Sequence, residues 1–155
     1  MGYINSLLNI LMALEKLHPP LRTYDISPDT ILIEQQRGRV FLTGFQVPPP
    51  PPPREPQRNS RRRRTTRKLA VSPYLPIQDK SYDQRTCIYA LAASMHHALS
   101  NVAPPHYPAY PPIRLLNPKV SPALERILSR ALSEDMALRY QSYEEMKQDV
   151  QRLLP

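Results

Sequence analysis

DISPDTILI (residues 25–33) and VFLTGFQ (residues 40–46) are the two stretches that decide how this chain folds. Each contains a short apolar run, Ile31–Ile33 in the first stretch and Val40–Leu42 in the second. Short apolar runs separated by a turn that contains a glycine, here Gly38, are typical of a β-hairpin. We therefore expect the polar residues of the two stretches to lie next to each other at the open end of one hairpin.

The two stretches resemble the catalytic loop and the metal-binding motif of protein kinases, which read H-R-D-x-K-P-x-N and D-F-G. Aligned without gaps, Asp25 stands at the catalytic aspartate and Thr30 stands at the metal-binding asparagine. Gly44 takes the place of the D-F-G aspartate, and Ser27 takes the place of the lysine that faces the phosphate. The resemblance implies a kinase frame from which several reactive groups have been lost.

The resemblance continues downstream. Ser72–Gln78 is similar to the segment that closes the activation loop in bacterial-type Ser/Thr kinases, with Gln78 in place of its glutamate. CIYALA is similar to the start of the large buried helix, with Cys87 in place of its aspartate. Ser121–Leu154 resembles the last two helices of the same lobe, and Arg139 matches the arginine that pairs with the lost glutamate.

The resemblance implies a mainly α-helical, kinase-like C-terminal lobe over residues 1–155, with one short β-hairpin. We find no Gly-rich loop, no V-A-I-K-like lysine strand and no helix with a glutamate partner for that lysine. Residues 47–70 have almost no apolar side chains, and we expect them to form a disordered Pro/Arg-rich insertion in place of the activation loop.

Apolar residues recur at helical spacing in residues 3–17 and 84–99, which predicts two amphipathic helices. Ser121 followed by Pro122 predicts the start of a third helix, and Ser142 with Glu145 predicts a capping box for a fourth. The proline-rich residues 103–118 are predicted to be irregular and held by four apolar side chains: Tyr107, Tyr110, Ile113 and Leu115.

The composition fits one domain of 155 residues without internal disulfides, because the chain has a single cysteine. No run of about 18 uncharged apolar residues is present, so we expect no membrane association. The bacterial style of the sequence favours a cytoplasmic location.

Most of the net charge of +8 comes from residues 54–68, where seven arginines and Lys68 oppose Glu55. This segment has several interpretations: a solvated loop without a function, or a patch for non-specific contact with acidic partners or nucleic acid. It could also be regulatory, because three hydroxyl residues beside the arginines are candidate phosphorylation sites: Ser60, Thr65 and Thr66.

The substitutions at the kinase-like motifs are expected to weaken phosphoryl transfer. Thr30 is a poorer magnesium ligand than an amide oxygen, and Gly44 offers no side-chain ligand, so we expect metal-dependent transfer to fail. Asp25 is then an inactive remnant that caps the following turn. Cys87 is expected to be a small buried residue, and Gln78 is expected to accept a weaker hydrogen bond from Arg139. We expect no metal site.

Three functional hypotheses follow. The first is a degenerate Ser/Thr kinase fragment, or pseudokinase, that binds no cofactor, lacks catalysis and acts through an unknown protein partner. The second is the C-lobe of an atypical Ser/Thr kinase, which would use ATP and magnesium when a separate N-lobe completes it. The third is a basic interaction module that binds acidic partners or nucleic acid through Arg54 to Lys68.

Overall fold

The computed structural model describes residues 2–18, 26–43, 73–76, 83–104 and 110–153. These ranges contain five helices and one two-stranded antiparallel sheet, which confirms the predicted mainly helical fold with one hairpin. The elements are, in chain order, α1 (Gly2–Glu15), β1 (Ile31–Glu34), β2 (Arg39–Leu42), α2 (Gln84–Ser100), α3 (Ile113–Leu116), α4 (Pro122–Ala131) and α5 (Tyr143–Gln151).

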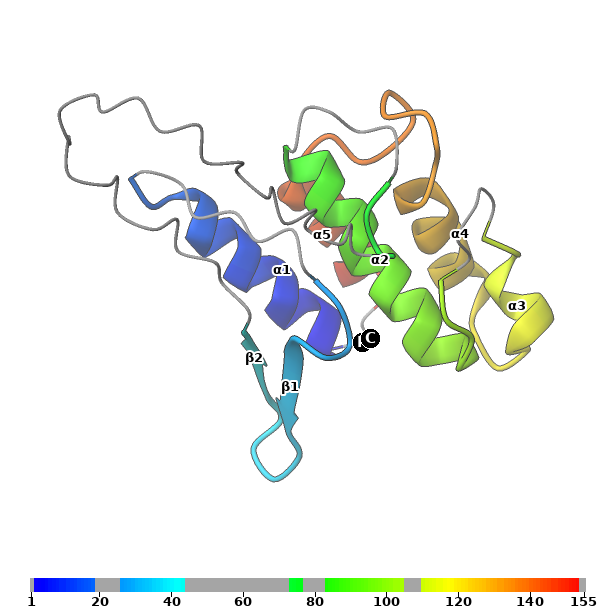
Figure 1. Cartoon of the computed structure of the whole chain (residues 1–155), viewed down its shortest axis with the longest axis horizontal. Helices are drawn as coiled ribbons and strands as arrows, with labels where there is room; N and C mark the ends of the chain where they lie inside the picture. The colour runs from blue at the N-terminus through cyan, green and yellow to red at the C-terminus, as the bar shows by residue number, and fades with distance from the viewer. Residues whose placement is uncertain (1, 19–25, 44–72, 77–82, 105–109, 154–155) are drawn as a thin grey trace, which may run out of the picture.

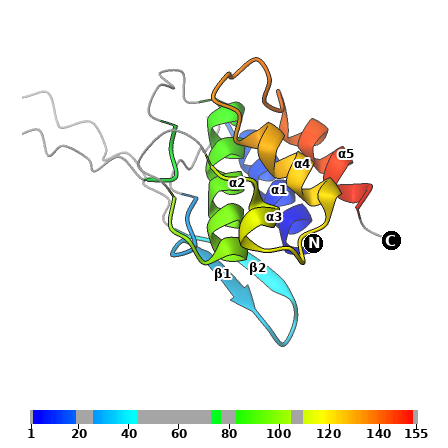
Figure 2. The same cartoon turned by 90° about the vertical axis from the view of Figure 1, so that its right-hand side faces the viewer.

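Helix α2 lies at the centre of the fold (Figure 1). Helix α1 packs on α5 and on strand β2, whereas α2 packs on α3 and α4. Figure 2 shows that the hairpin extends away from the helices at the end of the molecule where α1 begins. The turn at residues 26–30 precedes β1, and hydrogen bonds join it to α2 and to Thr43 at the end of β2.

Helix α1 buries one side against the core, as its spacing predicted. Ile4, Leu7, Leu8 and Leu11 are buried and recur three or four residues apart. The observed helix covers residues 2–15, so the predicted range of 3–17 is correct to within two residues at each end.

Helix α2 is the most deeply buried element of the described chain. Its N-cap is Asp83, whose carboxylate accepts a hydrogen bond from the Arg85 N–H at 2.9 Å. The helix ends at Asn101, which adopts a left-handed conformation with φ of 56°. Nearly all of its residues from Thr86 to His96 are buried, so α2 can hold in place the segments that pack on it.

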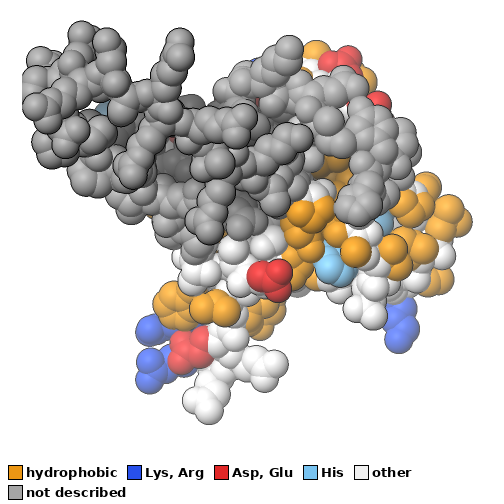
Figure 3. Space-filling view, in the orientation of Figure 1, with side chains coloured by type: hydrophobic (Ala, Val, Ile, Leu, Met, Phe, Trp, Pro, Cys, Tyr) orange, Lys and Arg blue, Asp and Glu red, His pale blue; other side chains and the backbone are white. Residues whose placement is uncertain are grey.

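The hairpin pairs Ile31 with Leu42 and Leu32 with Phe41, and Gly38 supplies the positive φ of 62° that its turn requires. One face packs on the core through Ile31 and Leu42. On the other face, Leu32 and Phe41 lie opposite each other with 53% and 49% of their surfaces exposed. The space-filling view shows hydrophobic side chains at the surface of the hairpin, at lower left (Figure 3).

The two predicted N-caps are confirmed. The hydroxyl of Ser121 accepts from the N–H of Leu124, and the hydroxyl of Ser142 accepts from the N–H of Glu145, each at 3.2 Å. The capping box at α5 is incomplete, since the Glu145 carboxylate accepts from the N–H of Gln141 at 2.8 Å, one residue before the cap.

The prediction for residues 103–118 was partly wrong, because Ile113–Leu116 forms the short helix α3. Its single turn buries Ile113 and leaves Leu115 75% exposed, so Leu115 does not hold this segment in place. Residues two positions apart point to different sides of a helix, which explains the difference. Tyr107 and the predicted insertion at 47–70 lie outside the described residues. No described helix has the length and apolar character needed to cross a membrane.

Candidate functional site

The turn before β1, at the position of the kinase catalytic loop, is closed by Thr30. The Thr30 hydroxyl accepts a hydrogen bond from the N–H of Ser27 and donates one to the carbonyl of Ser27, both at 3.0 Å. The backbone N–H of Thr30 donates to the same carbonyl at 3.0 Å. Pro28 follows Ser27, where its fixed φ favours a β-turn. Thr30 therefore serves as the local cap of this turn.

Helix α2 anchors the turn through Ser94. The Ser94 hydroxyl donates to the carbonyl of Ile26 at 2.5 Å and also lies 2.9 Å from the carbonyl of Ala90 in its own helix. Both Ser94 and Ile26 are buried. Ser94 was not among the residues predicted from the sequence. Its signal was a hydroxyl three residues after Leu91 and next to Met95, on the buried face of the helix.

The end of β2 meets the same turn. Thr43 donates to the carbonyl of Thr30 through its backbone N–H at 2.8 Å and through its hydroxyl at 3.1 Å. Thr43 directly precedes Gly44 in the sequence, and Thr30 is the residue that the sequence resemblance aligns with the metal-binding asparagine. The described residues on either side of the hairpin's open end are thus in contact, as the hairpin predicted. Gly44 itself lies outside the described residues.

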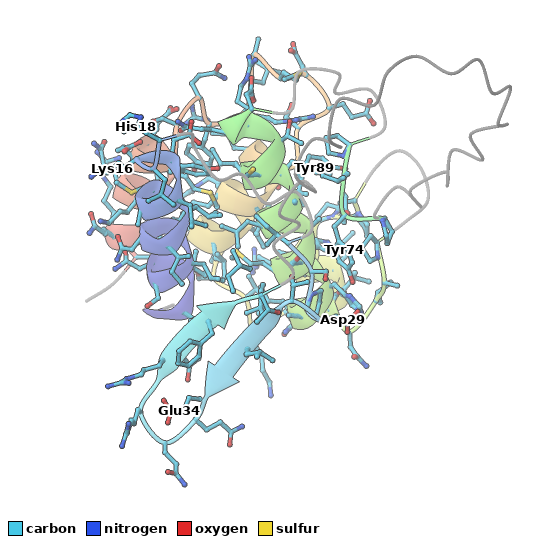
Figure 4. All side chains as sticks on the ribbon, turned by 60° about the vertical axis from the view of Figure 1, so that its left-hand side comes forward. Lys16, His18, Asp29, Glu34, Tyr74 and Tyr89 are labelled. Carbon is cyan, nitrogen blue, oxygen red and sulfur yellow. The ribbon has the colours of Figure 1, made fainter. Side chains whose placement is uncertain are left out.

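The side chains at these motif positions do not fit a kinase magnesium site. The Thr30 hydroxyl uses its proton and one lone pair within the turn, and Thr30 is only 8% exposed. Magnesium prefers carboxylate, phosphate and water oxygens in a regular octahedron. Glycine at position 44 has no ligating side chain. Asp29 is exposed on the same turn next to α2, whereas Glu34 lies far out on the hairpin (Figure 4).

Arg139 is almost completely buried, at 1% exposure, between α4 and α5. Its Nε donates to the carbonyl of Ser133 at 2.5 Å, and a terminal nitrogen donates to the carbonyl of Glu134 at 3.3 Å. The guanidinium also lies over the ring of Tyr89 in α2, 4.8 Å from its centroid. Arg139 therefore joins α2 to the loop after α4. The predicted partner, Gln78, lies outside the described residues.

Cys87 is fully buried in the first turn of α2, where its backbone N–H donates to the carbonyl of Asp83 at 3.3 Å. Asp83, four residues before Cys87, carries a negative charge and forms an ion pair with Arg85 at 2.5 Å. The hydrogen bond from the Arg85 side chain holds the pKa of the Asp83 carboxyl below its ordinary value, although partial burial opposes this shift. Asp83 is the N-cap of α2, and the sequence patterns described above did not predict this role.

The two histidines of α2 have protein partners. His97 Nδ1 lies 2.8 Å from the hydroxyl of Tyr74, which fixes residues 73–76 beside α2. His96 Nε2 lies 2.9 Å from the carbonyl of Pro111 and connects α2 to the segment before α3. Both contacts are consistent with a structural role. No group of three or more His, Cys, Asp or Glu residues that could hold a metal ion occurs within the ranges described above.

Several predicted functional residues lie outside the described ranges. These are the catalytic-position aspartate, the D-F-G-position glycine, the glutamine of the activation-loop end, the three candidate phosphorylation sites and the arginine-rich segment: Asp25, Gly44, Gln78, Ser60, Thr65, Thr66 and residues 54–68. Their assignments stay predictions. Of the predicted site residues, the structure describes Thr30, Cys87 and Arg139. We call the turn at residues 26–30 together with Thr43 the loop–hairpin junction. Among the three residues, the hydrogen bonds given above bring only Thr30 into this junction.

No protein-family model and no curated protein sequence matches this chain. The structure is similar to the crystal structure of the Mycobacterium tuberculosis PknI kinase domain, with a TM-score of 0.63 and 23% sequence identity. That match covers 97% of this chain and 54% of the kinase domain. A C20A_R136N double mutant of the same domain gives a TM-score of 0.64 at 23% identity and covers 99% and 55% of the two chains.

The matches establish that this chain has the fold of part of a protein kinase domain. The chain spans about half the length of the kinase domains that it matches, which agrees with the single lobe that the sequence predicted.

Proposed function

We propose that this chain is a degenerate kinase-like lobe that does not transfer phosphate and acts by binding a protein partner. The observation that carries the proposal is the position of the Thr30 hydroxyl, which is buried and hydrogen-bonded to both the N–H and the carbonyl of Ser27. A buried hydroxyl held in this way closes a turn, which makes it a poor metal ligand.

The neighbouring substitutions support the same proposal. Phosphoryl transfer depends on cations that neutralise the phosphate oxygens, and little covalent chemistry is left for the protein. Ser27 replaces the lysine of the kinase motif, and its hydroxyl lies 3.5 Å from the Thr30 hydroxyl. Together with Gly44, the chain has replaced one cationic group and two metal-ligating groups of the motif by small neutral residues.

The test is a phosphotransfer assay on the purified full chain with radiolabelled ATP, magnesium and a generic basic protein substrate. We expect no transfer above a control without protein, either to the substrate or to the chain itself. Magnesium-dependent transfer that is lost in an Asp25→Asn variant would refute the proposal, because it would assign catalysis to this chain.

The second candidate function is the C-lobe of an atypical Ser/Thr kinase. The observation that favours it is that the chain corresponds to only about half of the kinase domains that it matches. This candidate requires ATP binding and phosphotransfer that appear only when an N-lobe polypeptide is added. Binding of ATP in that mixture, together with labelled product, would favour this candidate over the degenerate lobe.

The third hypothesis concerns the basic segment, residues 54–68, and rests on sequence alone. Deleting these residues should abolish retention of an acidic protein or nucleic acid if the segment is the binding element. Unchanged retention of the same partner by the deletion variant would eliminate the hypothesis.

A further inference from the structure

An apolar groove of about 660 Å³ lies between α1, β1, α2 and the start of α4. It is lined mainly by aliphatic side chains from these elements, including Ile4, Leu7, Ile31, Met95, Leu99 and Leu124. Apolar clefts with volumes of about 300–1,000 Å³ are commonly ligand-binding sites.

Three uncharged polar side chains that line the groove, from Ser94, Asn117 and Ser121, already have hydrogen-bond partners within the chain. Ser94 donates to the carbonyl of Ile26, and Ser121 accepts from the Leu124 N–H as the cap of α4. Asn117 donates to the carbonyl of Leu99 at 2.9 Å and accepts from the N–H of Lys119 at 3.2 Å. The groove walls consequently present apolar surface with few groups that could bond an occupant.

Because the groove walls offer few hydrogen-bonding groups, they favour an occupant whose backbone groups are already hydrogen-bonded. A bound strand or loop would bury N–H and C=O groups without hydrogen bonds, and each such group costs about 1–3 kcal/mol. A helix satisfies its own backbone and presents only side chains. The groove is therefore suited to a helix with an apolar stripe, as in other helix-in-groove complexes.

The charge at the groove adds a second requirement. Among the described residues that line the groove, Lys119 is the only charged one, and its side chain is exposed. It takes part in none of the ion pairs found among the described residues. A carboxylate on the occupant, placed near Lys119, would complement this local positive charge.

The apolar surface extends beyond the groove, which favours a protein over a small ligand. Tyr3 and Ile33 line the groove and remain 42% and 45% exposed, respectively. An occupant that covers the rim as well as the groove must be larger than a single small molecule.

We infer that this groove binds an amphipathic, acidic α-helix of a protein partner, with apolar residues at i, i+3, i+4 and i+7 and a carboxylate facing Lys119. The inference rests on the proposed function, since it names the surface and the chemistry of the partner that the degenerate lobe binds.

The experiment selects helical peptides from a displayed library of 16-residue sequences on the immobilised full chain. We expect the enriched peptides to share an apolar stripe and an Asp or Glu at one end. The most enriched peptide is then synthesised, and its affinity is measured by fluorescence anisotropy. Ile33→Glu should weaken it at least tenfold, because it places a charge in the apolar groove, and Lys119→Glu should weaken it about threefold to tenfold.

Matched controls separate the groove from general effects. Leu115→Glu adds the same charge at an exposed leucine outside the groove, and Arg126→Glu reverses an exposed cation on α4. Both controls should bind the peptide as the parent does. A peptide whose acidic residue is changed to Lys should regain affinity for Lys119→Glu. Urea denaturation should give all four variants the stability of the parent within about 1 kcal/mol.

The outcomes distinguish this inference from the proposed function. Absence of enriched peptides, enriched peptides without helical spacing, or equal binding by Ile33→Glu and the parent would each overturn the groove as the helix site. The proposed function falls separately, through magnesium-dependent phosphotransfer by the chain. Peptides that lose binding to Leu115→Glu instead would leave the partner-binding lobe in place and move its docking surface to α3.

Discussion

Replacing Thr30 by valine removes one buried hydroxyl from the turn while nearly preserving the shape of the side chain. The N–H of Ser27 then loses the acceptor at 3.0 Å, and Ser27 is only 5% exposed, so water cannot readily replace it. An unsatisfied buried donor costs about 1–3 kcal/mol. The carbonyl of Ser27 keeps its bond from the Thr30 N–H, so its loss is smaller. We expect a total loss of about 2 kcal/mol in the free energy of unfolding.

Equilibrium urea denaturation, followed by circular dichroism, measures this loss as a change in the midpoint at constant slope. Thr30→Ser keeps the hydroxyl and removes one methyl group, so it should cost about 1 kcal/mol or less. Thr43→Val is a second control. The carbonyl of Thr30 still accepts from the Thr43 N–H at 2.8 Å, so this change should cost about 0.5–1 kcal/mol.

The reasoning would be refuted if Thr30→Val left the stability within about 0.5 kcal/mol of the parent. The capping role of the Thr30 hydroxyl would also be refuted if Thr30→Ser were as destabilising as Thr30→Val, because keeping the hydroxyl would then preserve no stability. Either result would remove the main support for a degenerate site.

Three further predictions concern the supports of the lobe. Ser94→Ala removes the donor to the loop carbonyl and should lower the free energy of unfolding by about 1–2 kcal/mol, whereas Ser129→Ala on the exposed side of α4 should leave it unchanged in the same urea titration. Arg139→Lys keeps the charge but loses the forked contacts with two carbonyls, so we expect a loss of about 2 kcal/mol, and an unchanged midpoint would contradict the role assigned to the guanidinium. The lowered pKa of Asp83 means that its contribution is present above its ordinary value of 3.8 and is lost as the pH falls through the folded-state value. Asp83→Asn retains a capping residue, so its stability difference from the parent should shrink below about pH 4 and stay constant near neutral pH; a difference that grows on acidification would contradict the ion pair with Arg85.

The parts of the fold that were predictable are those that depend on local spacing. Helical periodicity located α1 and α2, and the hydroxyls of Ser121 and Ser142 marked the starts of α4 and α5 because an N-cap bonds to residues two or three positions away. The hairpin was predictable from two short apolar runs and Gly38. In each case the decisive interaction lies within a few residues of the pattern.

The missed features depend on contacts between distant segments. Ser94 bonds to a carbonyl 68 residues away, and nothing near it in the sequence identifies that acceptor. The burial of Ile113 and the exposure of Leu115 depend on how α3 meets α2 and α4. Locating the groove required the arrangement of three helices and β1.

The role of Thr30 falls between these two cases. The resemblance to the kinase motif predicted that Thr30 is a weak metal ligand, and Asp25 was expected to cap the turn. Thr30 bonds to Ser27 three residues earlier and so caps the turn as well, whereas Asp25 lies outside the described residues and its role stays a prediction. This contact is local, so the general tendency of threonine hydroxyls to bond nearby backbone could have suggested it.

Under the proposed function, the loop–hairpin junction does not bind a metal–nucleotide complex. Manganese is paramagnetic and substitutes for magnesium, so a titration of the isotopically labelled full chain with manganese–ATP reports directly on this site through NMR line broadening. We predict that the amide signals of Thr30 and Thr43 lose no more intensity than those of exposed residues on α4. Selective, saturable broadening of the Thr30 and Thr43 signals, reversed by excess magnesium–ATP, would contradict the account.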